Sequence, residues 1–206
     1  MGLIESIQKT LFQRPKDKGL PEKPEKRSGG GGDNSMSDQQ PDQPPPVTPE
    51  EGRRNLKIGL GLAAVILVLD QISKYWIVQI VMDPPRVIEI TGFFNLVMVW
   101  NFGISFGMFN QASGWNAFIL TALALFISGC LAVWLYKVHE PLLRICLGLV
   151  IGGALGNAID RVVYGAVADF VDLHVAGYHW PAFNVADAAI VVGAALLVFD
   201  ALRTKG

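Results

Sequence analysis

The sequence has few charged residues and only two cysteines. Of its 206 residues, 17% are charged, whereas soluble domains carry about 25%. The formal net charge is −1, which gives no support for nucleic-acid binding. Cys130 and Cys146 both lie in apolar runs, where a thiol usually acts as a small hydrophobic side chain. These shortages argue against a soluble domain, a nucleic-acid-binding protein and a disulfide scaffold.

Apolar residues are abundant instead. They make up 51% of the chain, and the mean hydropathy is +0.37. Four apolar segments approach the roughly 20 residues that a helix needs to cross a bilayer. They cover residues 57–81, 115–136, 141–159 and 184–202. The sequence therefore predicts an all-α membrane protein with four transmembrane helices, within a domain that spans residues 56–206.

Residues 1–55 have a different composition and hold much of the charge. Runs such as "GGGGD" and "QPDQPPP" bury too little apolar surface to offset the entropy of ordering, so we predict a disordered N-terminal tail. Its first residues, "MGLIESIQKTLFQR", place apolar side chains on one helical face. A short helix on the membrane surface and a transient helix both fit this pattern.

The distribution of Lys and Arg predicts the orientation of the four spans. Basic residues precede the first span, flank the connection between the second and third, and follow the fourth. Because such residues concentrate on the cytoplasmic side, we expect both termini in the cytoplasm. These residues are Arg53, Arg54, Lys57, Lys137, Arg144, Arg203 and Lys205.

The two connections on the opposite, outer side of the membrane contain strand-like segments. "RVIEITGFFNLVMVWN" is rich in β-branched and aromatic residues, and "DFVDLHV" alternates partly with period two before the turn-prone "AGYH". We expect a small β-element of short strands on the outer face of the membrane. Aromatic-rich loops at the membrane interface, without a sheet, are the alternative.

Several polar residues lie within or beside the apolar segments, where charge is costly. Asp70 and Lys74 are four residues apart and share a helix face, so they can form an internal ion pair with a purely structural role. The stretch "GNAIDR" closes the third span. Its Arg161 suits either a bidentate clamp on a carboxylate or a contact with lipid headgroups.

Asp169 and Asp187 each end a Val-Ala-Asp triplet and fall on the same side of the membrane at similar depth. Two neighbouring carboxylates share one proton, and such a dyad can activate water for peptide hydrolysis. Other interpretations are a loop acid for Asp169 and a helix-start acid for Asp187, with Asn184 as the N-cap. Metal binding by Asp172, His174 and His179 is a further option, but these residues lack a recognised ligand spacing.

Five blocks in this order resemble lipoprotein signal peptidase, the signal peptidase II family. The blocks are "DQISK" (70–74), "NFGISFGMF" (101–109), "GGALGNAIDR" (152–161), "VADF" (167–170) and "FNVAD" (183–187). The resemblance implies an aspartic endopeptidase of the bacterial inner membrane. It would cut diacylglyceryl-modified prolipoproteins before the lipid-modified cysteine, among membrane lipids, with no cofactor or metal. One chain would suffice, so a functional monomer is expected.

The resemblance also assigns roles to residues. It implies that Asp169 and Asp187 are catalytic, and that a further set binds substrate or supports the site. Ser105 stands where family members commonly have Ala, and the long N-terminal tail is unusual for the family. The supporting set is Asp70, Lys74, Asn101, Asn157, Asp160, Arg161 and Asn184.

Two other functional classes fit parts of the sequence. A small transporter or membrane scaffold would use the acids as a polar path, but they cluster near one face of the membrane. An enzyme acting on lipid headgroups would use Arg161 and the acids on phosphate. Sensitivity to chelation distinguishes metal-dependent headgroup chemistry from an aspartic dyad.

Overall fold

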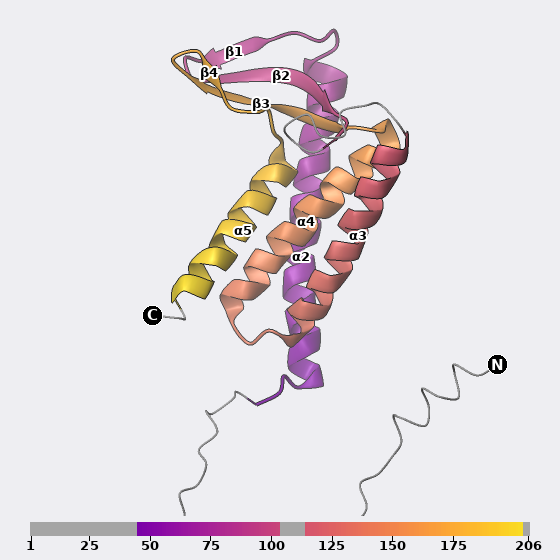
Figure 1. Cartoon of the computed structure of the whole chain (residues 1–206), viewed down its shortest axis with the longest axis vertical. Helices are drawn as coiled ribbons and strands as arrows, with labels where there is room; N and C mark the ends of the chain where they lie inside the picture. The colour runs from indigo at the N-terminus through magenta and orange to yellow at the C-terminus, as the bar shows by residue number, and fades with distance from the viewer. Residues whose placement is uncertain (1–44, 104–113, 204–206) are drawn as a thin grey trace, which may run out of the picture. The chain divides into compact units, whose positions relative to one another are not determined.

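The computed structural model describes residues 45–103 and 114–203. Four helical segments in this part of the chain are long and apolar enough to cross a membrane, as predicted. Figure 1 shows them as a bundle with the strands at one end. The elements are α2 (Pro49–Trp76), the π-helix η1 (Ile77–Val81), β1 (Ile88–Thr91), β2 (Phe94–Asn101), α3 (Gly114–Lys137), α4 (Pro141–Tyr164), β3 (Val167–Val175), β4 (Tyr178–His179) and α5 (Val185–Arg203).

Helix α2 begins at Pro49, earlier than the predicted start at residue 57 and inside the segment 1–55 assigned to the tail. Thr48 and Glu51 form a capping box that starts the helix. The Glu51 amide donates to Thr48 Oγ1 at 3.3 Å, and the Thr48 amide donates to Glu51 Oε2 at 2.9 Å. These caps satisfy backbone groups that would otherwise be unpaired, so the helix extends over a polar stretch that hydropathy alone does not detect.

Helix α4 packs against α2, α3 and α5. Small residues permit this close packing: a Cβ at Gly152 would lie only 2.7 Å from the Ala63 carbonyl oxygen of α2. The helix continues to Tyr164, beyond the predicted end at residue 159. It stops at Gly165, whose φ of 74° is the left-handed conformation that glycine adopts at low cost. Asp160 and Arg161 are therefore helical residues.

The strands form one antiparallel sheet in the order β1-β2-β3-β4. The predicted β-element is confirmed, and the alternative of loops without a sheet is wrong. In the β2–β3 pair, Asn95 lies opposite Asp172 and Val99 opposite Asp169. Ile77, Met82 and Phe170 pack together as a small buried core where α2 and η1 meet the sheet. This core fixes the sheet to the end of the bundle.

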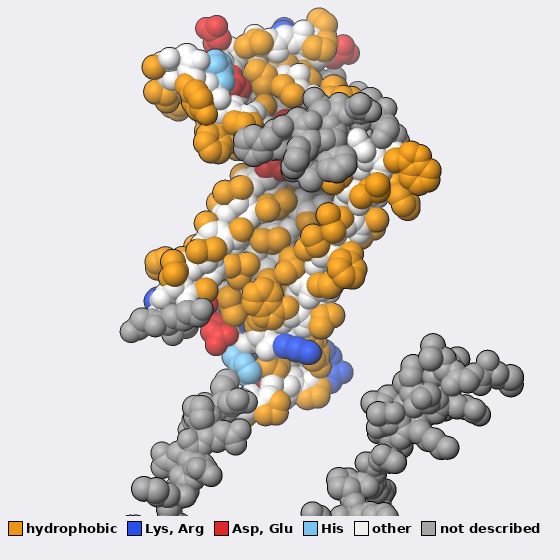
Figure 2. Space-filling view, in the orientation of Figure 1, with side chains coloured by type: hydrophobic (Ala, Val, Ile, Leu, Met, Phe, Trp, Pro, Cys, Tyr) orange, Lys and Arg blue, Asp and Glu red, His pale blue; other side chains and the backbone are white. Residues whose placement is uncertain are grey.

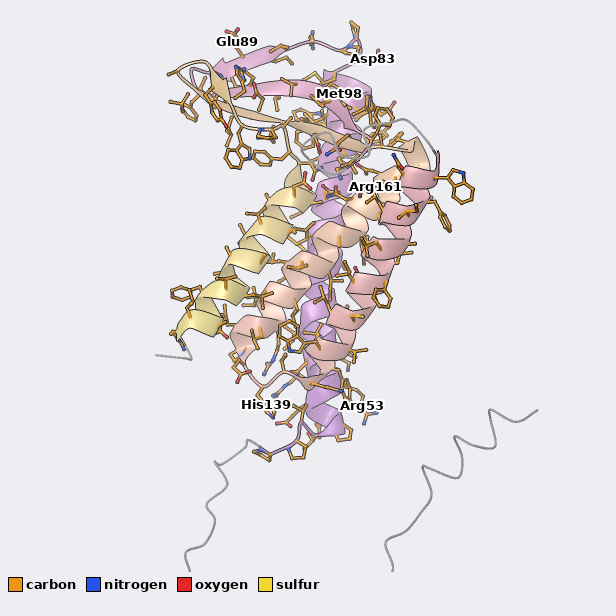
Figure 3. The ribbon with its side chains drawn as sticks, in the orientation of Figure 1. Arg53, Asp83, Glu89, Met98, His139 and Arg161 are labelled. Atoms are coloured by element: carbon orange, nitrogen blue, oxygen red, sulfur yellow. The ribbon has the colours of Figure 1, made fainter. Side chains whose placement is uncertain are left out.

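Apolar side chains cover the visible face of the helices, as Figure 2 shows. Lys and Arg side chains gather mostly at the end of the bundle opposite the sheet. In Figure 3, His139 and Arg53 mark that end, and Arg161 lies near the sheet. The bundle therefore has one basic end and one end that carries the sheet and the predicted catalytic residues.

Candidate active site

The predicted site residues come together where the bundle meets the sheet. They come from five different elements. Helix α2 carries Asp70 and Lys74, and the end of β2 carries Asn101. The last turns of α4 supply three residues, β3 supplies Asp169, and the start of α5 supplies Asn184 and Asp187. Ser105 and the rest of the block after Gly103 lie outside the described residues.

Asp187 lies in the first turn of α5, where its carboxylate takes part in the helix cap. The Asp187 amide donates to Asn184 Oδ1 at 2.9 Å, and the Asn184 amide donates to Asp187 Oδ2 at 3.3 Å. Asn157 Nδ2 donates to the other oxygen, Oδ1, at 2.7 Å. The helix-start interpretation of Asp187 is thus correct, and it also gives the carboxylate a fixed orientation.

Asp169 is buried on β3, with 2% of its surface exposed. The interpretation of this residue as an exposed loop acid is therefore wrong. Asn184 Nδ2 donates to Asp169 Oδ1 at 2.7 Å, and Asn101 Nδ2 donates to Oδ2 at 3.1 Å. Asn101 lies opposite Val167 in the sheet, so its side chain reaches Asp169 diagonally across the two strands.

Asp169 and Asp187 line the same cavity, which has a volume of about 620 Å³. Burial and, to a smaller extent, the negative charge of Asp187 together raise the pKa of Asp169 to about 7. A carboxyl group with such a pKa can hold a proton near neutral pH. The cavity continues along α5 past Ile190, Val191 and Val192, so its lining is apolar beyond the two carboxylates.

Lys74 joins two buried acids from different helices. Its Nζ lies 2.8 Å from Asp70 Oδ2 and 2.9 Å from Asp160 Oδ2, and all three side chains are at most 3% exposed. The predicted pairing of Asp70 with Lys74 is thus present. Because a charge left unpaired in this setting is costly, the three residues depend on one another.

Each of these acids also holds one of the two Val-Ala-Asp triplets. Asp70 Oδ1 accepts the amide of Ala186 at 2.9 Å, and Asp160 Oδ2 accepts the amide of Ala168 at 3.1 Å. Both alanines directly precede a predicted catalytic aspartate. Lys74 and its two acids therefore tie β3 and α5 to the ends of α2 and α4.

Lys74 is also linked to Asp187 through Asn157. Lys74 Nζ donates to Asn157 Oδ1 at 3.0 Å, while the Asn157 amide nitrogen donates to Asp187. Arg161 Nη1 donates to the Asn157 carbonyl oxygen at 3.2 Å, and its positive charge interacts with Asp187, Asp160 and Asp169. Among the described residues, the hydrogen bond of Arg161 goes to a backbone carbonyl and not to a carboxylate, so its charge acts on the acids without a bidentate clamp.

Gln71 is a site-supporting residue that the sequence interpretation did not select. Its Nε2 lies 3.0 Å from Asp160 Oδ1, 3.2 Å from Asp70 Oδ2 and 3.3 Å from the Gly156 carbonyl oxygen. Gly156 allows this approach, since a Cβ there would lie 2.6 Å from Asp70 Oδ2. A polar amide beside a buried acid in an apolar span was the signal available in the sequence.

Asp172, His174 and His179 lie together at the β3–β4 end of the sheet. His179 Nδ1 hydrogen-bonds both carboxylate oxygens of Asp172, at 2.9 and 3.0 Å, and the two histidine rings stack with centroids 4.8 Å apart. Within residues 45–103 and 114–203, no group of three His, Cys, Asp or Glu side chains has the arrangement of a metal site.

Comparison with known proteins gives similarity over most of the described residues. A family profile described as Signal peptidase (SPase) II matches residues 62–203. The chain is 48% identical over 151 residues to the lipoprotein signal peptidase of Ralstonia nicotianae, covering 70% of this chain and 83% of that protein. For that of Pseudoalteromonas atlantica, identity is 43% over 148 residues, covering 71% and 90%.

Solved structures agree with the sequence similarity. A bacterial membrane enzyme determined by the in meso method at 2.3 Å resolution is 28% identical, with a TM-score of 0.64. The match covers 72% of this chain and 89% of that one. The family profile spans all four of the apolar helices in part or in full, and it includes Asp70, Lys74, Asp169 and Asp187. The chain therefore belongs to the signal peptidase II family.

Proposed function

We propose that this chain is an aspartic endopeptidase that removes signal peptides from diacylglyceryl-modified prolipoproteins by cleaving before the lipid-modified cysteine. The observation that carries the proposal is that Asp169 and Asp187 line one cavity beside an apolar helix face. The name lipoprotein signal peptidase, borne by the relatives, supports the substrate class.

The mechanism begins with one proton shared by the dyad. We assign that proton to Asp169, whose pKa is raised to about 7. Asp187, in the first turn of α5, is then the base. Asp187 takes a proton from water as the water oxygen bonds to the scissile carbonyl carbon. Asp169 gives its proton to the carbonyl oxygen. The result is a neutral gem-diol, with the proton now on Asp187.

Collapse of the gem-diol returns the dyad to its first state. Asp169 takes a proton from one hydroxyl, Asp187 gives its proton to the amide nitrogen, and the C–N bond breaks. The products are a signal peptide with a new carboxyl terminus and a lipid-modified cysteine with a free amine. Water, substrate and the two aspartates hold every proton that moves. Asn157 and Asn184 keep the carboxylates in place throughout.

The depth of the dyad suits a substrate held in the membrane by its acyl chains. Trp76, Trp115 and Tyr164 are 52%, 75% and 43% exposed and lie at the sheet-side ends of three helices. Aromatic residues concentrate at membrane interfaces, so these side chains support a boundary near the level of the dyad. A substrate anchored at this boundary reaches the carboxylates by lateral movement, which removes part of the cost of encounter and orientation.

The basic end of the bundle supports a cytoplasmic location for both termini, with the sheet and dyad at the periplasmic face of the bacterial inner membrane. The residues of a single chain are enough to form the cavity that holds both aspartates. We therefore propose that a monomer is active among membrane lipids. The acids of the site gather at the sheet end, which favours a peptidase over a transporter with a polar path across the bundle.

The proposal is tested with the purified full chain in detergent and a diacylated prolipoprotein. Asp169→Asn and Asp187→Asn should each lower turnover by about 10³-fold, because each removes a carboxylate that accepts or donates a proton. Glu89→Gln is the matched control, since Glu89 is an exposed acid on β1. Turnover near that of the wild type in either aspartate variant would refute the dyad. Loss of cleavage on adding EDTA would favour metal-dependent chemistry instead.

A further inference from the structure

Asp172 lies on the opposite face of β3 from Asp169, since side chains three residues apart on a strand point to opposite faces. The residue is 6% exposed, and its carboxylate accepts hydrogen bonds from two neighbouring strands. Asn95 Nδ2 of β2 donates at 3.0 Å, and His179 of β4 binds both oxygens. A carboxylate only accepts hydrogen bonds, so His179 Nδ1 carries the hydrogen. This hydrogen bond holds the pKa of Asp172 below its usual range.

The residue after His179 reaches the active-site cavity. Trp180 lines that cavity together with Leu173, Asp169 and Asp187. Its amide donates to the Leu173 carbonyl oxygen at 2.8 Å, which holds the backbone of Trp180 against β3. Further along, Phe183 pairs with Val171. The short segment from Trp180 to Phe183 is therefore anchored at both ends, and the anchor before Trp180 is the pairing of β4 with β3.

The indole of Trp180 is not fixed by packing within a core, because the residue is 63% exposed. Trp180 and Leu173 also line a second, largely apolar cavity of about 380 Å³ beside His174 and Tyr178. The indole has room to move in that direction. The hydrogen bond between His179 and Asp172, reinforced by the stacking of His179 on His174, opposes such movement by fixing strand β4, which directly precedes Trp180.

We propose that Asp172 and His179 are positioning residues for substrate recognition, which hold Trp180 in place to pack against the apolar groups of the substrate beside the scissile bond. This inference rests on the proposed function. The pair lies across the sheet from the dyad and touches neither catalytic aspartate, so its contribution is to substrate binding. Loss of the pair raises KM and leaves kcat close to the wild-type value.

The test measures kcat and KM for cleavage of a diacylated prolipoprotein by the full chain in detergent. His179→Leu and Trp180→Ala should each raise KM about tenfold, as expected for loss of an apolar contact, with kcat within about twofold. The double variant should show no further rise in KM, because His179 acts through Trp180. His179→Asn should restore nearly normal KM, since its amide nitrogen can replace Nδ1 as donor to Asp172.

Four results would overturn the inference: additive rises in KM in the double variant, a lowered kcat at unchanged KM, unchanged kinetics in His179→Leu, or a raised KM in His179→Asn. Thermal unfolding of each variant in the same detergent identifies any that fail to fold. If His179→Leu does not fold, an unchanged KM in Trp180→Ala or a raised KM in His179→Asn overturns the inference. Wild-type protein that cleaves no diacylated substrate contradicts the proposed function, whereas active wild type with unaffected variants contradicts only this inference.

Discussion

The side-chain amides of Asn157 and Asn184 are hydrogen-bonded to each other, from Asn184 Nδ2 to Asn157 Oδ1 at 3.2 Å. Each amide nitrogen also donates to a different aspartate, Asn157 to Asp187 and Asn184 to Asp169, both at 2.7 Å. The two carboxylates are therefore oriented by one connected pair of amides. This pair couples α4, β3 and α5 at the point where chemistry is proposed to occur.

Substitution of Asn184 separates its two roles. Asn184→Ser keeps an N-cap acceptor for α5 but removes the buried donor to Asp169, so we expect turnover to fall about 10- to 100-fold and stability to fall by about 1–3 kcal/mol. Asn184→Ala loses both and should cost about a further 1 kcal/mol of stability. Turnover and unfolding in detergent provide the two measurements. Equal turnover in Asn184→Ser and wild type would show that the contact with Asp169 is dispensable.

The raised pKa of Asp169 predicts a loss of activity at alkaline pH. As pH rises through about 7, Asp169 gives up the shared proton, so kcat/KM should fall about tenfold per pH unit above that value. A profile from pH 5 to 9 measures this. Activity that stays constant to pH 9 would mean that Asp169 does not supply the proton.

The same pKa has a consequence for stability. The folded-state pKa of Asp169 lies above the ordinary value of 3.8, so the folded state binds more protons between these values. The stabilising contribution is complete below pH 3.8 and is lost as pH rises through about 7. Unfolding temperatures in detergent at pH 4.5 and 7.5 should therefore differ less in Asp169→Asn than in the wild type. An identical difference would contradict the assigned pKa.

Lys74 is expected to matter mainly through the two acids that it pairs. Lys74→Met leaves Asp70 and Asp160 buried without their cation and should destabilise the fold by about 3–5 kcal/mol. Adding Asp160→Asn should recover part of that loss, since one buried charge is removed and the new amide oxygen can still accept the Ala168 amide. Unfolding in detergent measures both variants. A double variant less stable than Lys74→Met would refute this account.

The start of α2 sets the limit for shortening the chain. Asn55 is 1% exposed, and its Nδ2 donates to the Val138 carbonyl oxygen at 2.6 Å, which joins α2 to the α3–α4 connection. Deleting residues 1–44 should leave cleavage intact, because every site residue lies beyond them. Loss of cleavage on deletion, with normal membrane insertion, would assign the tail an active role.

Asn55→Ala should lower the free energy of unfolding by about 1–3 kcal/mol, because the buried Val138 carbonyl oxygen loses its hydrogen-bond donor.

Much of the fold could be predicted from local patterns. Long apolar runs predict the four spans because a helix in lipid satisfies its own backbone hydrogen bonds, and β-branched runs predict the strands. Thr48, Pro49 and Glu51 form a capping-box pattern that also indicates the start of α2. Hydropathy alone places this start too late in the sequence. Asp169 and Asp187 were singled out by shared depth, and the family resemblance made their role specific.

Only the tertiary structure decided which residues hold those aspartates. Asp70 is separated by 116 positions from Ala186, whose amide it accepts, and Gln71 by 89 from Asp160. No local pattern encodes such contacts, because they depend on how closely α2, α4 and α5 pack. The sequence by itself determined the spans, the strands and the chemical groups available. Packing decided that one lysine and two acids hold both Val-Ala-Asp triplets, since buried charges are stable only where the fold supplies their partners.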